Sequence, residues 1–254
     1  MVMAALDPIW LTKTETASRL RGRIEAILDW AAVRGHRKGE NPARWRGHLQ
    51  KALPTIRKSL RVRHHPALPF ADIAPFMQKL ARQAGVSARA LEFCILTATR
   101  TGETIHARWG EIDLDKAMWI IPAERMKIPR EHRVPLSPAA LAILVNLRQS
   151  AAPLDFLFPG LRAARPLSNM ALLMTLKRMG RGDLTTHGFR STFRDWVAES
   201  TDFPREVAEA ALAHIVSNQV EAAYRRGDLF DKRRQLMDAW GAYCVPAPSK
   251  AHTV

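Results

Sequence analysis

Hydrophobic residues recur at helical spacing along most of this chain of 254 residues. Between residues 12 and 35, apolar side chains return every three or four positions and a glycine follows them: Leu20, Ile24, Ile27, Leu28, Ala31 and Gly35. A shorter, basic helical segment comes next in "NPARWRGHLQKALP". The same spacing predicts further helices over residues 72–84, 87–99, 138–149, 169–180, 187–199, 205–213, 217–225 and 229–243.

Residues that favour helix N-caps indicate where several of these helices begin. Asp72, Ser87 and Ser137 each precede a predicted helix, and their side-chain oxygens suit the free N–H groups of a first turn. Thr186 is the expected cap of the helix that follows it. These residues therefore predict the first turns of four helices.

The pattern changes in the middle of the chain. "AMWIIP" and "HRVPL" are two short strand candidates, and "AERMKIPRE" connects them. Two strands joined in this way form a hairpin. The expected fold class is therefore mainly α with a small antiparallel β-sheet, an α+β arrangement.

A proline-rich stretch, "RVRHHPALPFADIAP", separates two parts of different composition. Pro66, Pro69 and Pro75 interrupt any long regular element there. We therefore expect a small helical domain over residues 1–66 and a larger domain over residues 67–254.

Charge narrows the choice of partner. Lysine and arginine total 39 against 24 acidic residues, a formal net charge of +15. Residues 1–66 alone hold 14 basic and 5 acidic residues. An excess of this size favours a polyanion, because neutralising phosphates releases counterions. Nucleic acid is the preferred interpretation, and a solvated basic face without a partner is the alternative.

Several classes of protein are disfavoured. No run of about 18 apolar residues predicts a membrane span, and the N-terminus does not resemble a signal peptide. Cys94 and Cys244 lack the spacing of a metal site, which favours a reduced, cytoplasmic protein. No glycine-rich phosphate loop or G-x-S-x-G elbow is present. We expect no cofactor and no metal.

"TTHGFRSTFRDW" places two polar residues, His187 and Arg190, on one helix face. They lie near a helix N-terminus, where free N–H groups and partial positive charge suit an anion. The simpler interpretation is a histidine that only hydrogen-bonds near a helix start.

Four further residues are candidates, each with an ordinary alternative. Arg100 follows an apolar helix beside Glu103, and it could equally be a surface arginine at a helix end. Lys127 lies in the hairpin connection, where most lysines are simply solvated. His214 and Tyr224 are ten residues apart around a predicted turn, although Tyr224 could be an ordinary half-buried tyrosine.

Taken in chain order, these motifs resemble the tyrosine recombinase family, in particular phage-type integrases. "TRTGETIHARWGEIDL" is similar to the first arginine box of the family, and "AERMKIPREHRVPLS" to its lysine segment. "HGFRSTFRDW" matches its His-x-x-Arg box. "LAHIVSNQVEAAYRRGDLFDKRRQLMDAW" resembles the box that carries the nucleophile. The resemblance covers roughly residues 10–243, and a match of spaced boxes is more specific than any one motif.

The resemblance implies a tyrosine-recombinase catalytic domain preceded by a partial helical core-binding domain. An arm-binding domain is expected to be absent. The implied reaction is metal- and ATP-independent cutting and rejoining of DNA through a 3′-phosphotyrosyl link. The implied catalytic residues are Arg100, Lys127, His187, Arg190, His214 and Tyr224. Tyr224 is the implied nucleophile, and Glu103 is expected to orient Arg100.

The resemblance also implies partners. They are double-stranded DNA at attachment sites, other protomers in a tetrameric synapse, and DNA-bending accessory proteins. The C-terminal segment after Tyr224 is expected to pack on a neighbouring protomer, because its helix carries Leu229, Phe230, Leu236, Met237 and Trp240. A bacterial cytoplasmic protein, nucleoid-associated when bound to DNA, is implied. Two alternatives stay open: a truncated, non-catalytic DNA-binding remnant of an integrase, and a basic nucleic-acid-binding protein unrelated to recombination.

Overall fold

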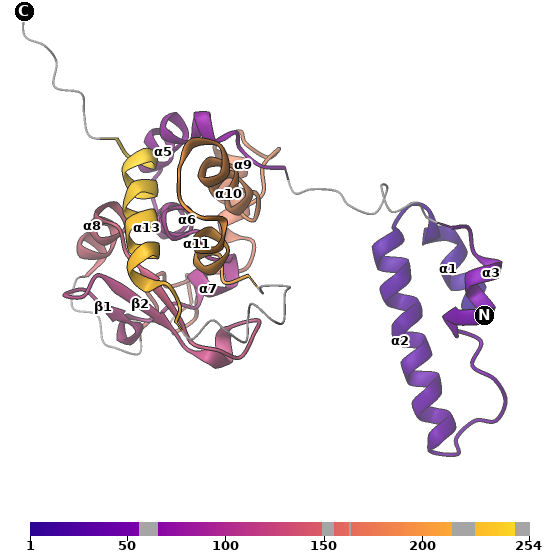
Figure 1. Cartoon of the computed structure of the whole chain (residues 1–254). Helices are drawn as coiled ribbons and strands as arrows, with labels where there is room; N and C mark the ends of the chain where they lie inside the picture. Colours follow the sequence, from indigo (N-terminus) through magenta and orange to yellow (C-terminus); the bar gives the residue numbers. More distant parts are fainter. Residues whose placement is uncertain (56–65, 149–154, 163, 215–226, 247–254) are drawn as a thin grey trace, which may run out of the picture. The chain divides into compact units, whose positions relative to one another are not determined.

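The computed structural model describes residues 1–55, 66–148, 155–162, 164–214 and 227–246. The chain forms two compact units, Met1–His64 and His65–Val254. Both units appear in Figure 1, each with its own core. The predicted helix over 217–225 lies outside the described residues.

The smaller unit is helical. Its helices are α1 (Val2–Trp10), α2 (Thr14–Val33) and α3 (Gln50–Ala52), the last preceded by a distorted turn over Trp45–Leu49. Leu6, Trp10, Ala17, Leu49 and Leu53 form its core. Helix α1 was not predicted from the apolar spacing. In the second half of α2, Ile27 and Trp30 remain 65% and 57% exposed.

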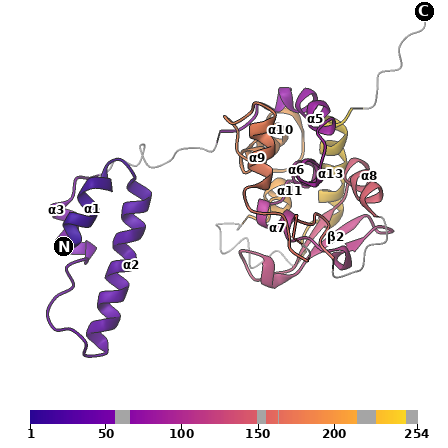
Figure 2. The same cartoon turned by 180° about the vertical axis from the view of Figure 1, so that it is seen from behind.

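The larger unit is mainly helical with one small sheet, which confirms the predicted fold class. Its elements are α5 (Ile73–Ala81), α6 (Val86–Thr97), α7 (Thr101–Ile105), β1 (Ile112–Asp113), β2 (Met118–Ile121), β3 (His132–Pro135), α8 (Pro138–Leu147), α9 (Ala171–Arg178), α10 (Gly188–Ser200), α11 (Arg205–Ala211) and α13 (Phe230–Cys244). Helix α6 runs through the middle of this unit in both views (Figures 1 and 2). Every residue from Ala90 to Thr97 is buried, so α6 is the element around which the others pack.

The sheet has the order β1-β2-β3 and is antiparallel throughout. Trp119 pairs with Val134, and both are buried. The two predicted strands are β2 and β3. The two-residue strand β1 was missed, because so short a segment carries no alternation that a sequence pattern could reveal.

Two of the four predicted caps are wrong. Helix α6 begins after Gly85, whose φ of +97° suits glycine. Ser87 instead lies in the first turn and accepts a hydrogen bond from Thr175 Oγ1 at 3.0 Å. Before α10 the hydroxyl that caps is Thr185, which accepts from Gly188 N at 3.0 Å, not Thr186. When two residues that favour caps are adjacent, as Thr185 and Thr186 are, the loop conformation decides which hydroxyl reaches the free N–H group, and the sequence alone does not show it.

The other two predicted caps lie where they were expected. Ser137 Oγ accepts a hydrogen bond from Ala140 N at 3.4 Å, as an N-cap should. Asp72 occupies the N-cap position of α5, but its side chain makes no capping hydrogen bond.

Helix α13 corrects an expectation about assembly. Its apolar face was expected to pack on a neighbouring protomer, yet Leu236, Met237 and Trp240 are at most 1% exposed within this chain. Trp240 Nε1 donates to Ile95 O on α6 at 2.9 Å. Figure 1 shows α13 lying along α6, α8 and α11. The apolar face of α13 is therefore buried in the core of the larger unit.

Helix α10 is pressed against the chain that enters the larger unit. At Gly188 a side chain would collide with the carbonyl oxygen of Pro66. Thr192 Oγ1 donates to Leu68 O at 2.6 Å, so the same segment is held one turn further along. This contact fixes the start of α10, which carries His187 and Arg190.

In the described part of the chain, no helix is long and apolar enough to cross a membrane.

Candidate active site

Arg100 lies where α6 ends. Ala98 takes a left-handed conformation there, with φ of +50°, and Arg100 becomes the N-cap of α7. Glu103, only 5% exposed, accepts from Arg100 Nη1 at 2.6 Å and from its backbone N at 2.7 Å. As expected, Glu103 orients Arg100. Charge-assisted bonds of this kind hold a guanidinium in one direction.

Arg190 lies on the first turn of α10 and is 5% exposed. Its guanidinium donates to the carbonyl oxygens of Ala98 and Leu212, the latter at 2.6 Å. Its Nε has no partner among the described residues. Burial and the nearby Arg100 guanidinium lower the pKa of Arg190 to about 10, so it remains charged near neutral pH.

His214 follows α11 and links two charged residues. Its Nδ1 lies 2.7 Å from Glu209 Oε2, and its Nε2 lies 3.1 Å from Arg190 Nη2. Burial lowers the pKa of His214, the bond to Glu209 opposes this, and the Arg190 charge lowers it further. The ring is therefore neutral near pH 7.

Three candidate residues from distant parts of the chain meet at one short backbone segment. Arg190 Nη2 donates to Leu212 O, and Arg100 Nη2 donates to Ala213 O at 3.2 Å. His214 is the next residue. The electrostatic repulsion between the two arginines is offset by these carbonyls and by Glu103. Two oriented cations with a histidine beside them are suited to bind an anion.

The hairpin that carries Lys127 is tied to the same region. Lys127 is exposed in the connection between β2 and β3. Two residues earlier, Arg125 donates to Glu111 Oε2 and, at 3.5 Å, to Glu103 O on α7. The base of the hairpin is thus anchored on the element that orients Arg100.

Of the remaining two candidates, His187 lies within the described part of the chain. His187 is the exposed N-cap of α10, and its carbonyl accepts from Arg190 N at 3.1 Å. It therefore lies at the same helix end as Arg190. Tyr224 lies outside the described residues.

Two residues of this region were missed by the sequence analysis. Glu209 is one, because a carboxylate five positions before a histidine matches no helical pairing rule. His132 on β3 is the other. Its ring bonds the backbone of Ala211, and burial together with the Arg233 charge lowers its pKa to about 4. Alternation along a strand could have placed it on the sheet, but not beside this site.

We expect His132→Gln to reduce the acid sensitivity of the fold. The folded pKa of about 4 lies below the usual 6.5, so the unfolded chain binds a proton first. The His132 contribution to stability is therefore lost as the pH falls from about 6.5 to 4. The measurement is the free energy of unfolding in urea near pH 7 and near pH 4.5.

The difference in pH dependence between the parent and His132→Gln reports the His132 ring alone. Burial raises the pKa of Glu92 to about 7, which makes the fold more stable at low pH, the opposite of the His132 effect. Because Glu92 is present in the parent and in His132→Gln, its contribution cancels when their free energies of unfolding are subtracted. His106→Gln removes an exposed histidine and serves as the control. Equal pH dependence in the parent and in His132→Gln would contradict the assignment.

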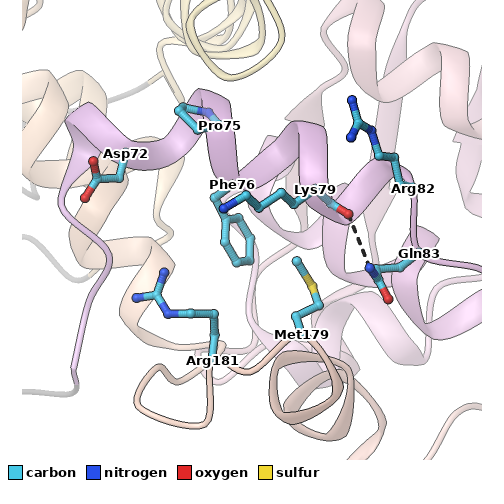
Figure 3. Close-up of a pocket in the computed structure, with 8 residues that line it drawn as sticks. All are labelled: Asp72, Pro75, Phe76, Lys79, Arg82, Gln83, Met179 and Arg181. Atoms are coloured by element: carbon cyan, nitrogen blue, oxygen red, sulfur yellow. Dashed lines mark hydrogen bonds between the residues drawn. The ribbon is translucent and has the colours of Figure 1, made fainter.

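A surface hollow of about 420 Å³ lies elsewhere on the larger unit. Figure 3 shows Lys79 of α5 and Arg181 of the loop after α9 on either side of the Phe76 ring. None of the described candidate residues lines it. Phe76 also packs against Phe189 of α10, with 5.1 Å between the ring centroids, so one wall of the hollow contacts the helix that carries Arg190.

Comparisons with known proteins find matches for both units of the chain. The Phage integrase family model matches residues 67–228, and the Phage integrase central domain model matches residues 1–48. Prophage integrase IntA of Escherichia coli (strain K12) is 43% identical over 244 residues, which cover 92% of this chain and 56% of that protein. The chain thus spans about half the length of this relative.

Two solved structures of lambda integrase share the fold. A dimer bound to a COC' core site matches with a TM-score of 0.58 and 16% identity, over 90% of this chain and 79% of that one. A tetramer bound to a Holliday junction matches with a TM-score of 0.60 and 17% identity, over 86% and 64%. Identities this low support the fold alone, whereas the family model, which matches more than half of the chain, shows the family. The chain therefore belongs to the phage integrase family of tyrosine recombinases.

Proposed function

We propose that this protein is a site-specific DNA recombinase that cuts and rejoins strands to integrate or excise a mobile element. The observation that carries the proposal is the meeting of Arg100, Arg190 and His214 at the backbone of residues 212–214. Tyr224 follows ten residues later in the chain. A phosphodiester is the anion of DNA that such a cluster would bind.

The reaction is a transesterification. The phenol oxygen of Tyr224 attacks phosphorus, a 3′-phosphotyrosyl bond forms, and the bond to the 5′-oxygen breaks. The departing oxygen takes a proton, which Lys127 supplies. A second strand then attacks the same phosphorus through its 5′-hydroxyl and releases the tyrosine. One phosphoester bond is exchanged for another at each step, so no energy source is consumed.

The arginines supply the main electrostatic contribution. Negative charge gathers on the non-bridging oxygens in the transition state, and Arg100 and Arg190 present forked donors to them. Both guanidiniums are held by fixed carbonyls and by Glu103, so little reorganisation is needed when the phosphate arrives. His187 and His214 add hydrogen bonds or manage the phenol proton.

The two parts of the chain have different tasks in this proposal. Residues 1–66 bind the duplex through phosphate contacts as a partial core-binding domain, since they carry 14 of the 39 basic residues. Residues 67–254 form the catalytic domain. Partners are attachment-site DNA, further protomers in a tetrameric synapse, and DNA-bending accessory proteins. The protein acts in the cytoplasm, on the bacterial nucleoid.

The test is covalent capture. Nicked duplexes that tile the DNA flanking the gene are incubated with the protein, because a nick beside the cleavage site lets the short fragment diffuse away and traps the enzyme. We expect an adduct on a denaturing gel, and mass spectrometry of the digested adduct should locate the DNA on Tyr224. Binding to these duplexes without any adduct would instead identify a non-catalytic DNA-binding remnant.

A further inference from the structure

One residue, Glu209, holds His214 at two points. Its Oε2 accepts from the His214 ring at Nδ1, 2.7 Å away, and its backbone carbonyl accepts from His214 N at 2.9 Å. The two residues are five apart, with the end of α11 between them. Both the backbone and the ring of His214 are therefore anchored on the same residue.

The two ring contacts determine which nitrogen carries the proton. Arginine has only donors, so Nε2 of His214 must accept from Arg190 Nη2. An ionised carboxylate only accepts, so Nδ1 must carry the hydrogen. The neutral ring is thus held as the Nδ1–H tautomer, with its lone pair at Nε2 facing Arg190.

Glu209 is itself held in an ionised state. Its Oε1 accepts from Arg194 Nε on α10 at 2.8 Å, and the Arg205 Nε lies 3.7 Å away. Burial alone would raise the pKa of the Glu209 carboxyl, but the bonds from Arg194 and His214 outweigh it and lower the pKa. The Glu209 carboxylate therefore connects Arg194 on α10 to His214 in the loop after α11.

We propose that Glu209 is a positioning residue for His214, fixing its ring and its Nδ1–H tautomer so that Nε2 enters the reaction as an acceptor. This rests on the proposed function. A carboxylate that orients an imidazole and stabilises its protonated form is an arrangement known to serve acid–base catalysis. Here Nε2 gives up its hydrogen bond from Arg190 and takes the proton that the attacking phenol releases, and Glu209 balances the resulting positive charge across the ring.

The first experiment needs no DNA. The full chain, with its histidine rings labelled with ¹⁵N and ¹³C, is titrated by NMR, and the His214 signals are assigned with His214→Gln. We expect the Nδ1–H tautomer in the parent protein. In Glu209→Gln the amide oxygen still accepts from Nδ1, so the tautomer persists while the pKa of His214 falls by about one unit. In Glu209→Ala the acceptor is lost, so the Nε2–H tautomer should grow.

The control is Glu206→Gln. It removes the same charge from the first turn of α11 and leaves the Glu209 carboxylate in place. It should leave the pKa and tautomer of His214 unchanged. Thermal unfolding of each variant, compared with the parent, reports any general loss of structure. Unchanged His214 signals in both Glu209 variants would overturn the proposal, as would an equal shift in Glu206→Gln.

The second experiment measures adduct formation against pH. We expect adduct formation to be slower in Glu209→Gln and slower still, by about 100-fold, in Glu209→Ala, because a positioned general base contributes about 10²–10⁴-fold. The acid limb of the rate profile should move to lower pH in Glu209→Gln, because it follows protonation of His214. A parental rate and acid limb in both variants would overturn the role in the reaction even if the NMR titration shifts.

The two proposals fail separately. If the parent protein forms no adduct on any duplex, the proposed function is wrong and the reaction role of Glu209 falls with it. The titration would still decide whether Glu209 sets the tautomer of His214. If the parent forms the adduct but the tautomer and pKa of His214 are the same in the Glu209 variants, only the present inference is wrong.

Discussion

Replacing Tyr224 with phenylalanine is expected to eliminate covalent capture of DNA. Phenylalanine has no atom that can bond to phosphorus, so the loss should be complete, whereas removing one oxyanion donor costs about 10²–10³-fold. DNA affinity should stay close to that of the parent, because no charge is removed. The measurements are adduct yield on a nicked duplex and binding by fluorescence anisotropy at one fixed salt concentration.

The chain supplies its own matched control, since it contains only two tyrosines. Tyr243 stacks on Trp196, with ring centroids 5.3 Å apart, and lies 6.2 Å from Trp240. Phenylalanine preserves that stacking, so Tyr243→Phe should form adduct at the parental rate. An adduct that persists in Tyr224→Phe, or one that vanishes in a well-folded Tyr243→Phe, would refute the assignment of the nucleophile.

The second large effect is expected for Arg190→Lys, which should slow adduct formation about 10²–10³-fold. A guanidinium reaches Ala98 O, Leu212 O and His214 Nε2 from one planar fork, and a single ammonium cannot reproduce that geometry. A lysine buried beside Arg100 would also tend to lose its proton. The measurement is the single-turnover rate of adduct formation at saturating protein.

Stability is measured separately for this variant, because carbonyls left without a donor cost about 1–3 kcal/mol each. The control is Arg178→Lys on α9, an exposed arginine that donates to Ser87 and Thr175. It should leave the rate within a few fold of the parent. A rate for Arg190→Lys close to that of Arg178→Lys would mean that Arg190 does not serve the transition state.

Local patterns in the sequence were sufficient for most of the architecture. The central helix of the larger unit was predicted because Leu91, Ile95 and Leu96 recur at helical spacing, and the hairpin because two short strand candidates flank one connection. The link between Glu103 and Arg100 was also expected, since residues three apart at a helix start face each other. Information of this kind lies within a few residues of each position.

Contacts between distant residues could not be predicted in the same way. The apolar face of α13 indicates only that it must be covered, and the fold decides that its own core covers it. Likewise, His132 and Glu209 have no sequence feature that sets them apart from other polar residues. Their roles depend on which carbonyl or guanidinium the fold brings within about 3 Å.

By itself, the sequence determined the fold class, the basic character of the chain and its kinship with the integrases, because each of these is encoded in local spacing and composition. The tertiary structure alone decided that Arg100, Arg190 and His214 share one backbone segment and that a carboxylate oxygen of Glu209 lies 2.7 Å from the ring of His214. The physical reason is that hydrogen bonds act over a few ångströms, while the residues they join here are separated by up to 113 positions in the chain.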